Sequence, residues 1–259
     1  MTALLPVWTL CKRELVRFYR DRGRIIGALT PPIVFWFLIG SGLGASFQMP
    51  GANQGMNFLQ YFFSGTLVLI VLFTSVFATI SIIEDRREGF LQSVLVAPIS
   101  RLSIVLGKVL GASTVGFLQG LTFLIFAKAA GLSVTPMGYV LAALILLLSS
   151  LGLTGIGFCI AWKLDSTQGF HAVMNLFLIP MWMLSGALFP VLTAPGWLRL
   201  IIGLNPITYA VSGLQQALCS GNPASAQLAP MSLCLVILSG FVGAVLLASA
   251  WLAKSRDYR

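Results

Sequence analysis

The residues best suited to bind a partner lie in one short segment that follows the second long apolar stretch of the chain. Five charged residues stand in a row at 84–88, and the residues after Gly89 are mostly apolar or small until Pro98. This apolar part is far too short to cross a bilayer, and a helix would place side chains four residues apart on one face. The pattern is typical of an amphipathic helix that docks into a groove on another protein, and equally of a loop whose apolar side faces lipid. The candidate contact residues are Glu84, Asp85, Arg86, Arg87, Glu88, Gly89, Phe90, Leu91, Leu95 and Pro98.

Residue types that catalyse reactions are present, but they are not placed to act together. Ser185 and His171 fall on the same expected helix about four turns apart, roughly 20 Å by helical rise, so they cannot form a serine–histidine pair. The sequence contains no GxxxxGK[ST] phosphate loop. Its four scattered cysteines and single histidine indicate neither a disulfide scaffold nor a metal site. We therefore expect no catalytic residue, no metal and no cofactor in this chain.

Composition shows which elements must position the charged segment. Hydrophobic residues make up 58% of the 259 residues and charged residues 9%, against roughly 25% charged in an ordinary soluble chain. These values exclude a soluble enzyme, a large domain outside the membrane and intrinsic disorder. A spanning helix needs about 20 apolar residues, so we expect an all-α membrane protein with six transmembrane helices. The six apolar stretches are Ile25–Phe47, Phe62–Ile83, Ser103–Ala127, Gly138–Trp162, Phe170–Phe189 and Met231–Ala253.

Charge placement indicates how the six spans are oriented. In a six-span arrangement, fourteen of the 16 lysines and arginines and all 7 acidic residues fall on one side. The positive-inside rule makes this side cytoplasmic and places both termini there. We expect Lys108 to lie close enough to the end of the third span to snorkel to the interface. Because the basic residues occupy short loops rather than one folded face, nucleic acid is not an expected partner.

The first 24 residues predict a helix that lies on the membrane surface. An apolar stripe recurs at spacings of four and three, and most of the charge lies on the opposite face, a pattern that favours the lipid interface. The alternatives are a solvated basic tail, which leaves the stripe unexplained, and a cleavable signal, against which the long polar start argues. The stripe consists of Leu4, Trp8, Cys11, Leu15 and Phe18. The residues expected to act at the surface are Trp8, Lys12, Arg13, Arg17 and Arg20.

Prolines predict an interrupted or kinked helix in two of the spans. Pro31 and Pro32 lack amide hydrogens, so we expect a bend or a fresh helix start early in the first span. Pro180 falls in the middle of the fifth span, where it removes a backbone hydrogen bond and should kink the helix. Together with Gly186, this makes the fifth span a candidate moving or pathway-lining element.

The stretch 193–230 falls on the outer side and contains two apolar pieces that are too short to cross the bilayer. Between them, Asn205 and Pro206 have the chemistry of a helix start, with an N-cap acceptor followed by proline at the first helical position. Trp197 and Tyr209 suit the membrane interface. We expect a pair of short re-entrant helices here.

Three runs of the chain resemble the signature of ABC-2 type permeases, the membrane subunits of bacterial ATP-driven exporters. The runs are 88–100 (EGFLQSVLVAPIS), 184–190 (LSGALFP) and 204–209 (LNPITY). The resemblance covers nearly the whole chain. It implies that 84–98 is a coupling helix inserted into an ATPase subunit, that 1–24 is a connecting helix, and that 193–230 forms the short external helices. The expected organisation is thus a connecting helix at 1–24, a transmembrane domain at 25–253 that includes 84–98 and 193–230, and a cytoplasmic tail at 254–259.

The same resemblance implies a permease of the bacterial inner membrane that acts as a dimer, with a second copy of itself or a paralogous permease. Two ABC ATP-binding subunits would bind ATP and Mg, so this chain would be a transport subunit and not an enzyme. Cargo would pass between two protomers along faces of the first, second and fifth spans. Drugs, lipids, polysaccharides and lipo-oligosaccharides all remain open as cargo, although the lack of a large external domain resembles the compact drug and polysaccharide branches of the family. The alternative function is a secondary transporter or channel that works without an ATPase partner.

Overall fold

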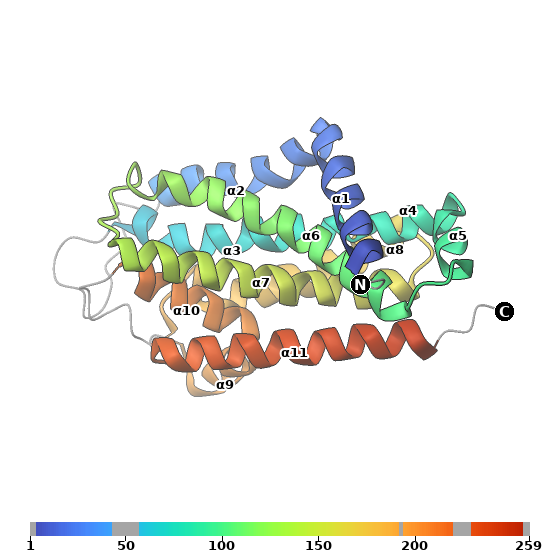
Figure 1. Cartoon of the computed structure of the whole chain (residues 1–259). Helices are drawn as coiled ribbons and strands as arrows, with labels where there is room; N and C mark the ends of the chain where they lie inside the picture. The colour runs from blue at the N-terminus through green and yellow to red at the C-terminus, as the bar shows by residue number, and fades with distance from the viewer. Residues whose placement is uncertain (1–3, 43–56, 192–193, 220–228, 256–259) are drawn as a thin grey trace.

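The computed structural model describes residues 4–42, 57–191, 194–219 and 229–255, and all regular structure in these ranges is helical. Six helices are long and apolar enough to cross a membrane, which confirms the expected fold class and number of spans. They run side by side, and α1 crosses them steeply at one end of the bundle (Figure 1). The helices are α1 (Leu4–Arg20), α2 (Arg22–Gly42), α3 (Phe58–Ala78), α4 (Ile80–Arg87), α5 (Phe90–Val96), α6 (Arg101–Leu124), η1 (Ile125–Ala127), α7 (Pro136–Lys163), α8 (Thr167–Trp182), η2 (Met183–Ala187), α9 (Gly196–Leu204), α10 (Pro206–Leu218) and α11 (Met231–Ser255).

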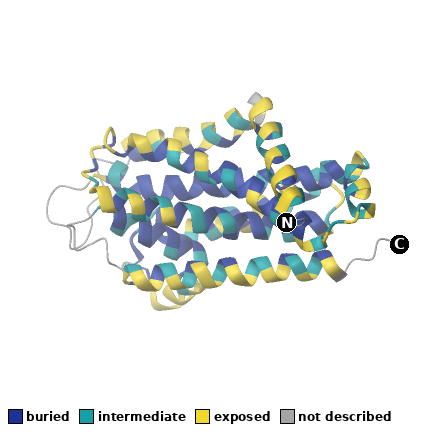
Figure 2. Cartoon of the chain, viewed as in Figure 1, coloured by how far each residue is buried: buried dark blue, intermediate teal, exposed yellow. Residues whose placement is uncertain are grey.

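Helix α3 is the centre of the bundle. It packs against α2, α6, α7 and α10, and almost all of its residues are buried by the rest of the chain. Most residues of α2 and α11 are at least partly exposed, because each of these helices contacts the bundle along one side only (Figure 2). Thr74 and Phe77 of α3 still line a pocket together with residues of α2 and α8. The expectation that the second span lines a path between two protomers stays a prediction.

The charged segment is not one coupling helix over 84–98. Helix α4 continues the line of α3 after a tightened turn at Thr79, whose N–H donates to the carbonyl oxygen of Val76 at 3.0 Å. Four of the five consecutive charges therefore stand on an extension of the second span, one turn beyond the predicted end at Ile83. Gly89 then turns the chain with φ of 77°, a left-handed conformation that glycine adopts without steric cost, and α5 follows as a separate short helix.

The two proline sites behave differently. Helix α2 runs unbroken from Arg22 to Gly42 through Pro31 and Pro32, so the expected fresh helix start is wrong. Only two N–H donors are missing there, and in lipid the remaining backbone groups have no better partners than those of a helix. Pro180 lies inside α8, and the helix loses its regular winding three residues later, in the π-helical turn η2. Within that turn Gly186 departs from helical geometry, with φ of 80°.

One end of the bundle contains α9 and α10, so the two short helices expected in this region are present; that they are re-entrant and lie on the outer side stays a prediction. The side chain of Asn205 accepts a hydrogen bond from the N–H of Ile207 at 3.0 Å, and Pro206 is the first residue of α10, which confirms the predicted helix start. The Asn205 amide also donates to the carbonyl oxygen of Met181 at 2.5 Å, which ties α10 to the end of α8. Tyr209 donates to the carbonyl oxygen of Gly203, and Trp197 is exposed.

Candidate functional site: a buried charge junction at one end of the bundle

Helix α1 packs closely against α6 because two glycines of α6 leave room for it. A Cβ atom at Gly107 would lie 2.7 Å from the Cβ atom of Leu10, and one at Gly111 would lie 2.7 Å from the Cβ atom of Glu14. Small residues four apart let two helix backbones approach closely. The close approach buries the side of α1 that carries Leu10, Glu14 and Phe18.

The buried side of α1 is not the stripe that the sequence pattern indicates. Leu4 and Trp8 belong to that stripe, yet they are 75% and 66% exposed, whereas the acidic Glu14 is buried. Phe18 is the member of the stripe that the bundle fully covers. The stripe was expected to face lipid, so the exposure of Leu4 and Trp8 leaves that expectation a prediction. Hydrophobic periodicity does not indicate that the carboxylate of Glu14 is buried against a matching cation.

That cation is Lys108 of α6. Its ammonium donates to a carboxylate oxygen of Glu14 and to Oδ2 of Asp85, and the three side chains are 3%, 4% and 0% exposed. The expectation that Lys108 snorkels to the interface is therefore wrong. A buried charge is costly unless an opposite charge neutralises it, and here carboxylates from two different helices do so.

Two arginines of α1 complete the arrangement. Arg13 donates two parallel hydrogen bonds to the carboxylate of Asp85, both at 2.8 Å, and Arg17 donates a third at 2.8 Å. Such charge-assisted, two-pronged bonds are stronger than neutral ones, and the bond to Asp85 raises the pKa of Arg13. We call the set Arg13, Glu14, Arg17, Asp85 and Lys108 the charge junction. It is the place where α1, α4 and α6 meet.

The charge junction extends toward the tip of the bundle through its two arginines. Arg17 also contacts Glu84 at 3.0 Å and Glu88 at 3.4 Å. The guanidinium of Arg13 lies 3.6 Å from the centre of the Phe90 ring, a cation–π contact that links α1 to α5. The first helix is therefore bound to both parts of the predicted coupling segment.

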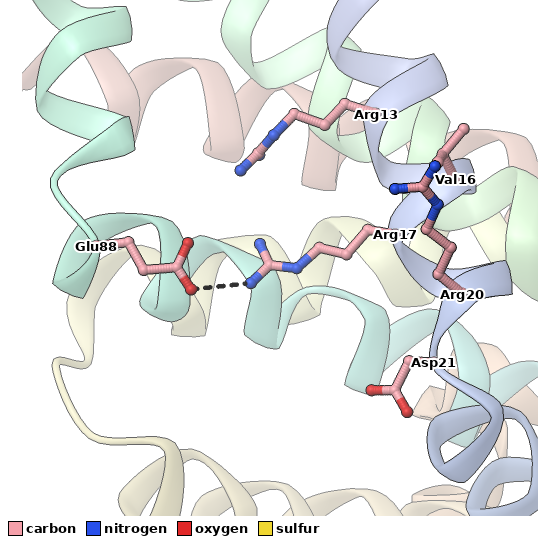
Figure 3. A pocket seen from close by; sticks show the side chains of 6 residues that line it. All are labelled: Arg13, Val16, Arg17, Arg20, Asp21 and Glu88. Atoms are coloured by element: carbon pink, nitrogen blue, oxygen red, sulfur yellow. Dashed lines mark hydrogen bonds and ion pairs between the residues drawn. The ribbon is translucent and has the colours of Figure 1, made fainter.

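A groove of about 620 Å³ opens beside these contacts. Figure 3 shows Arg13 and Arg17 reaching from α1 toward Glu88, with the Arg17–Glu88 ion pair as a dashed line. Arg20 and Asp21 also line the groove, and Lys12 is exposed to solvent. Of the basic residues predicted on the first helix, Arg13 and Arg17 thus bind the buried Asp85. Lys12 and Arg20 are exposed.

Arg86 and Arg87 point to another part of the molecule. Arg86 donates to the carbonyl oxygens of Trp162 and Leu164, both at 2.8 Å, and pairs with Asp165 at 2.7 Å. Arg87 donates to the backbone carbonyl oxygen of Asp165 at 2.9 and 3.1 Å. Both arginines thus bind the turn that joins α7 to α8, where the free carbonyl groups at the end of a helix favour a cation.

Helix α5 exposes only some of the residues that were predicted to contact a partner. Leu91 is 1% exposed and packs into the core, so the idea that it projects as a docking knob is wrong. Phe90 and Leu95 are half-buried, and Gln92, Ser93, Val96 and Pro98 are exposed. The surface that α5 offers to a partner is therefore polar at its centre, with one apolar residue, Val96, at its end.

The structure does not bring the remaining predicted residues to the charge junction. Pro180 and Gly186 lie along α8 and η2, and the predicted residues of α9 and α10 lie at the opposite end of the bundle (Figure 1). Sequence reasoning missed the roles of Glu14, Lys108 and Asp165. The spacing of Gly107 and Gly111 was a usable signal for a close helix contact, and Lys108 stands between those two glycines.

Within the described ranges, no three histidine, cysteine, aspartate or glutamate residues are placed to bind a metal ion. What the geometry does show is that α1, α4 and α6 are joined by ion pairs at one end of the bundle.

Comparison with known proteins gives a consistent result. Residues 6–219 match the family model described as ABC-2 type transporter. The chain is 29% identical over 214 residues to the putative transport permease ycf38 of Cyanophora paradoxa, with 81% of this chain and 72% of the relative covered. It is 27% identical to nodulation protein J of Rhizobium meliloti (strain 1021), with 77% and 75% covered. It is 32% identical to the linearmycin resistance permease protein LnrN of Bacillus subtilis (strain 168), with 61% and 41% covered.

Proposed function

Since the chain belongs to the ABC-2 type transporter family, we propose that it is the permease subunit of an ATP-driven exporter that functions as a dimer with two separate ATP-binding subunits. ATP and Mg would bind to those subunits, because this sequence has no phosphate loop. The chain itself would supply the membrane path and the surface through which motion enters. Its site would be the bacterial inner membrane, with both termini in the cytoplasm.

The observation that carries this proposal is the link between α1 and the segment α4–α5. Two elements far apart in the sequence are joined by ion pairs to the buried carboxylate of Asp85, at the end of the bundle where α5 is exposed. A permease that is powered by a separate ATPase needs a rigid element that is displaced by the ATPase and transmits this displacement to the membrane spans. Buried, multiply bonded charges are suited to this role because they hold one geometry.

The proposed orientation, with the α5 end of the bundle in the cytoplasm, is supported by the elements that lie at that end. Helix α1, the end of α4, α5 and the C-terminal end of α11 lie together (Figure 1). The predicted cytoplasmic charges of these elements are therefore gathered at one end, as the positive-inside rule requires of a cytoplasmic face. An ATPase in the cytoplasm would approach this end of the bundle.

The cargo path would run along α2 and α8. Both helices leave large apolar side chains exposed, including Phe35 and Phe37 on α2 and Leu176 and Phe177 on α8. A second protomer, identical or paralogous, would face these side chains across the path. One relative is named as a linearmycin resistance permease protein, and a permease that confers resistance would fit an export function.

The docking surface can be tested by changing an exposed residue of α5. Val96 is 88% exposed, and Val96→Glu should abolish copurification of the ATP-binding subunit that is expressed together with this chain. Leu204→Glu is the matched control, since Leu204 is a similarly exposed apolar residue (79%) on α9 at the other end of the bundle. The control should copurify normally.

The proposal also predicts where hydrolysis takes place. The purified permease alone should not hydrolyse ATP, and the complex should. Robust hydrolysis by the isolated permease, or uphill transport by the permease without any nucleotide-binding subunit, would contradict the assignment. The second of these results would favour the secondary transporter.

A further inference from the structure

Helix α4 is bound on two sides by consecutive residues. Asp85 belongs to the charge junction, and the next two residues, Arg86 and Arg87, bind the turn between α7 and α8. Successive side chains on a helix point about 100° apart, at 3.6 residues per turn. Neighbouring residues of α4 can therefore reach different helices, and this short helix has two separate points of attachment.

The first attachment leads to α2. Asp85 accepts three hydrogen bonds from α1, two from Arg13 and one from Arg17, and the carboxylate is fully buried. Helix α1 ends at Arg20 and α2 begins at Arg22, so a single residue separates them. A displacement of α4 that carries α1 with it must therefore reach the first membrane span.

The second attachment leads to α8. Arg86 holds the last carbonyl groups of α7 and the carboxylate of Asp165. The next residue, Ser166, caps α8 by accepting a hydrogen bond from the N–H of Gly169 at 3.3 Å. A displacement of α4 that carries Asp165 with it therefore reaches the start of the fifth membrane span.

We infer that α4 divides a displacement of the α5 tip between two routes, and that Asp85 and Arg86 are the positioning residues of those routes. Asp85 passes the displacement through α1 to α2, and Arg86 passes it through the α7–α8 turn to α8. The source of the displacement rests on the proposed function, whereas the two attachments exist in the permease alone. Because α2 and α8 carry the exposed apolar faces, one input would move both walls of the path.

A purely structural role for these residues predicts a different outcome from two routes. If Asp85 and Arg86 only stabilised the fold, weakening either one would loosen the whole end of the bundle. If they belong to separate routes, Asp85→Asn should free α1 and leave α8 in place, and Arg86→Gln should do the reverse. The two variants must therefore be compared at two reporter positions.

Spin-label distance measurements on the purified permease in nanodiscs provide this comparison. In a background without the four native cysteines, one label is placed at Ser93 on α5 and the second at Tyr19 on α1 or Gln168 on α8, all of them exposed. Asp85→Asn should broaden the 93–19 distance distribution and leave 93–168 unchanged. Arg86→Gln should broaden 93–168 and leave 93–19 unchanged. Lys163→Gln, which removes an exposed charge beside the same turn, is the control and should change neither.

A second variant protects the test against misfolding. Arg13→Gln removes two of the three bonds from α1 to Asp85 without touching α4, and it should give the same pattern as Asp85→Asn. Variants that each broaden both distributions, or that broaden neither, would overturn the inference. This measurement is made on the permease without any ATPase, so its outcome tests the two attachments independently of the proposed function.

The assembled complex then tests transmission. Trapping the complex with ATP and vanadate should shift both distances in the otherwise unchanged permease. With Asp85→Asn the shift of the α1 reporter should be lost and that of the α8 reporter kept, and with Arg86→Gln the pattern should reverse. Loss of both shifts in each variant would overturn the division into two routes.

Discussion

The ammonium of Lys108 lies in the interior, between carboxylates from α1 and α4. Removing one partner of a buried ion pair typically costs roughly 3–5 kcal/mol, because the other charge is left without compensation. Asp85 would keep its two arginines after such a change, whereas Glu14 would lose its nearest cation. The stability of this end of the bundle therefore depends on Lys108 mainly through Glu14.

We predict that Lys108→Met lowers the thermal stability of the purified permease strongly, and that adding Glu14→Gln recovers part of the loss. The neutral side chain at position 14 no longer needs a buried cation, so the double variant should be more stable than the single one. Thermal unfolding in detergent measures the effect. Lys163→Met is the control because Lys163 is an exposed cation at the same end, and an equal loss in this control would contradict the prediction.

Tyr61 offers a second prediction at the same scale. Its buried hydroxyl donates to the carbonyl oxygen of Gly186 at 2.6 Å and so connects α3 with the π-helical turn η2. Tyr61→Phe leaves that carbonyl group with one partner fewer in the interior, which should cost about 1–3 kcal/mol. Thermal unfolding again measures the loss. Tyr139→Phe, at a half-buried tyrosine of α7, should change stability little, and similar losses in both variants would argue against a special role for the bond.

At the scale of elements, the contact between α1 and α6 depends on two glycines four residues apart, Gly107 and Gly111. Hydrophobic periodicity correctly indicates that the first residues form a helix with two unlike faces. It does not indicate that Glu14 is buried, because the matching cation, Lys108, belongs to another helix. A buried ion pair joins residues of two helices, so the residue pattern of either helix alone cannot predict it.

We predict that Gly111→Val displaces α1 from α6. The new Cβ atom would lie 2.7 Å from the Cβ atom of Glu14 and 3.1 Å from the carbonyl oxygen of Cys11, so α1 must move away. Gly240→Val is the control, since a Cβ atom at Gly240 of α11 meets nothing within 4 Å. The displacement can be followed through the reactivity of the neighbouring Cys11.

Burial, with a smaller contribution from the charge of Glu14, raises the pKa of the Cys11 thiol. When α1 moves outward, this pKa should fall toward the ordinary value, and the reactive thiolate will form at lower pH. In a background that keeps Cys11 alone, maleimide labelling of Gly111→Val should therefore be faster, and its rise with pH should begin earlier. Unchanged labelling in Gly111→Val, or equal acceleration in Gly240→Val, would show that α1 is not held by this contact.

At the scale of the whole molecule, the features that depend on local chain chemistry could be predicted from the sequence. The six spans follow from runs of apolar residues, and the start of α10 follows from Asn205 and Pro206. The enclosure of α3 could not be predicted, because every span is apolar and apolarity does not separate a lipid-facing helix from a central one. The attachment of Arg86 to Asp165 was equally out of reach, since it joins residues 79 positions apart.

The arrangement of the ends makes a final prediction about topology. Val96 on α5 and Leu204 on α9 are both highly exposed apolar residues, and they lie at opposite ends of the bundle. If α5 faces the cytoplasm, a membrane-impermeant maleimide added to intact spheroplasts should label Leu204→Cys and spare Val96→Cys. In inverted membrane vesicles the pattern should be reversed. Because the six spans fix the two ends on opposite sides, labelling of both positions from one side would contradict the six-span arrangement. A reversed pattern would instead contradict the cytoplasmic placement of the charge junction and, with it, any access for a cytoplasmic ATPase.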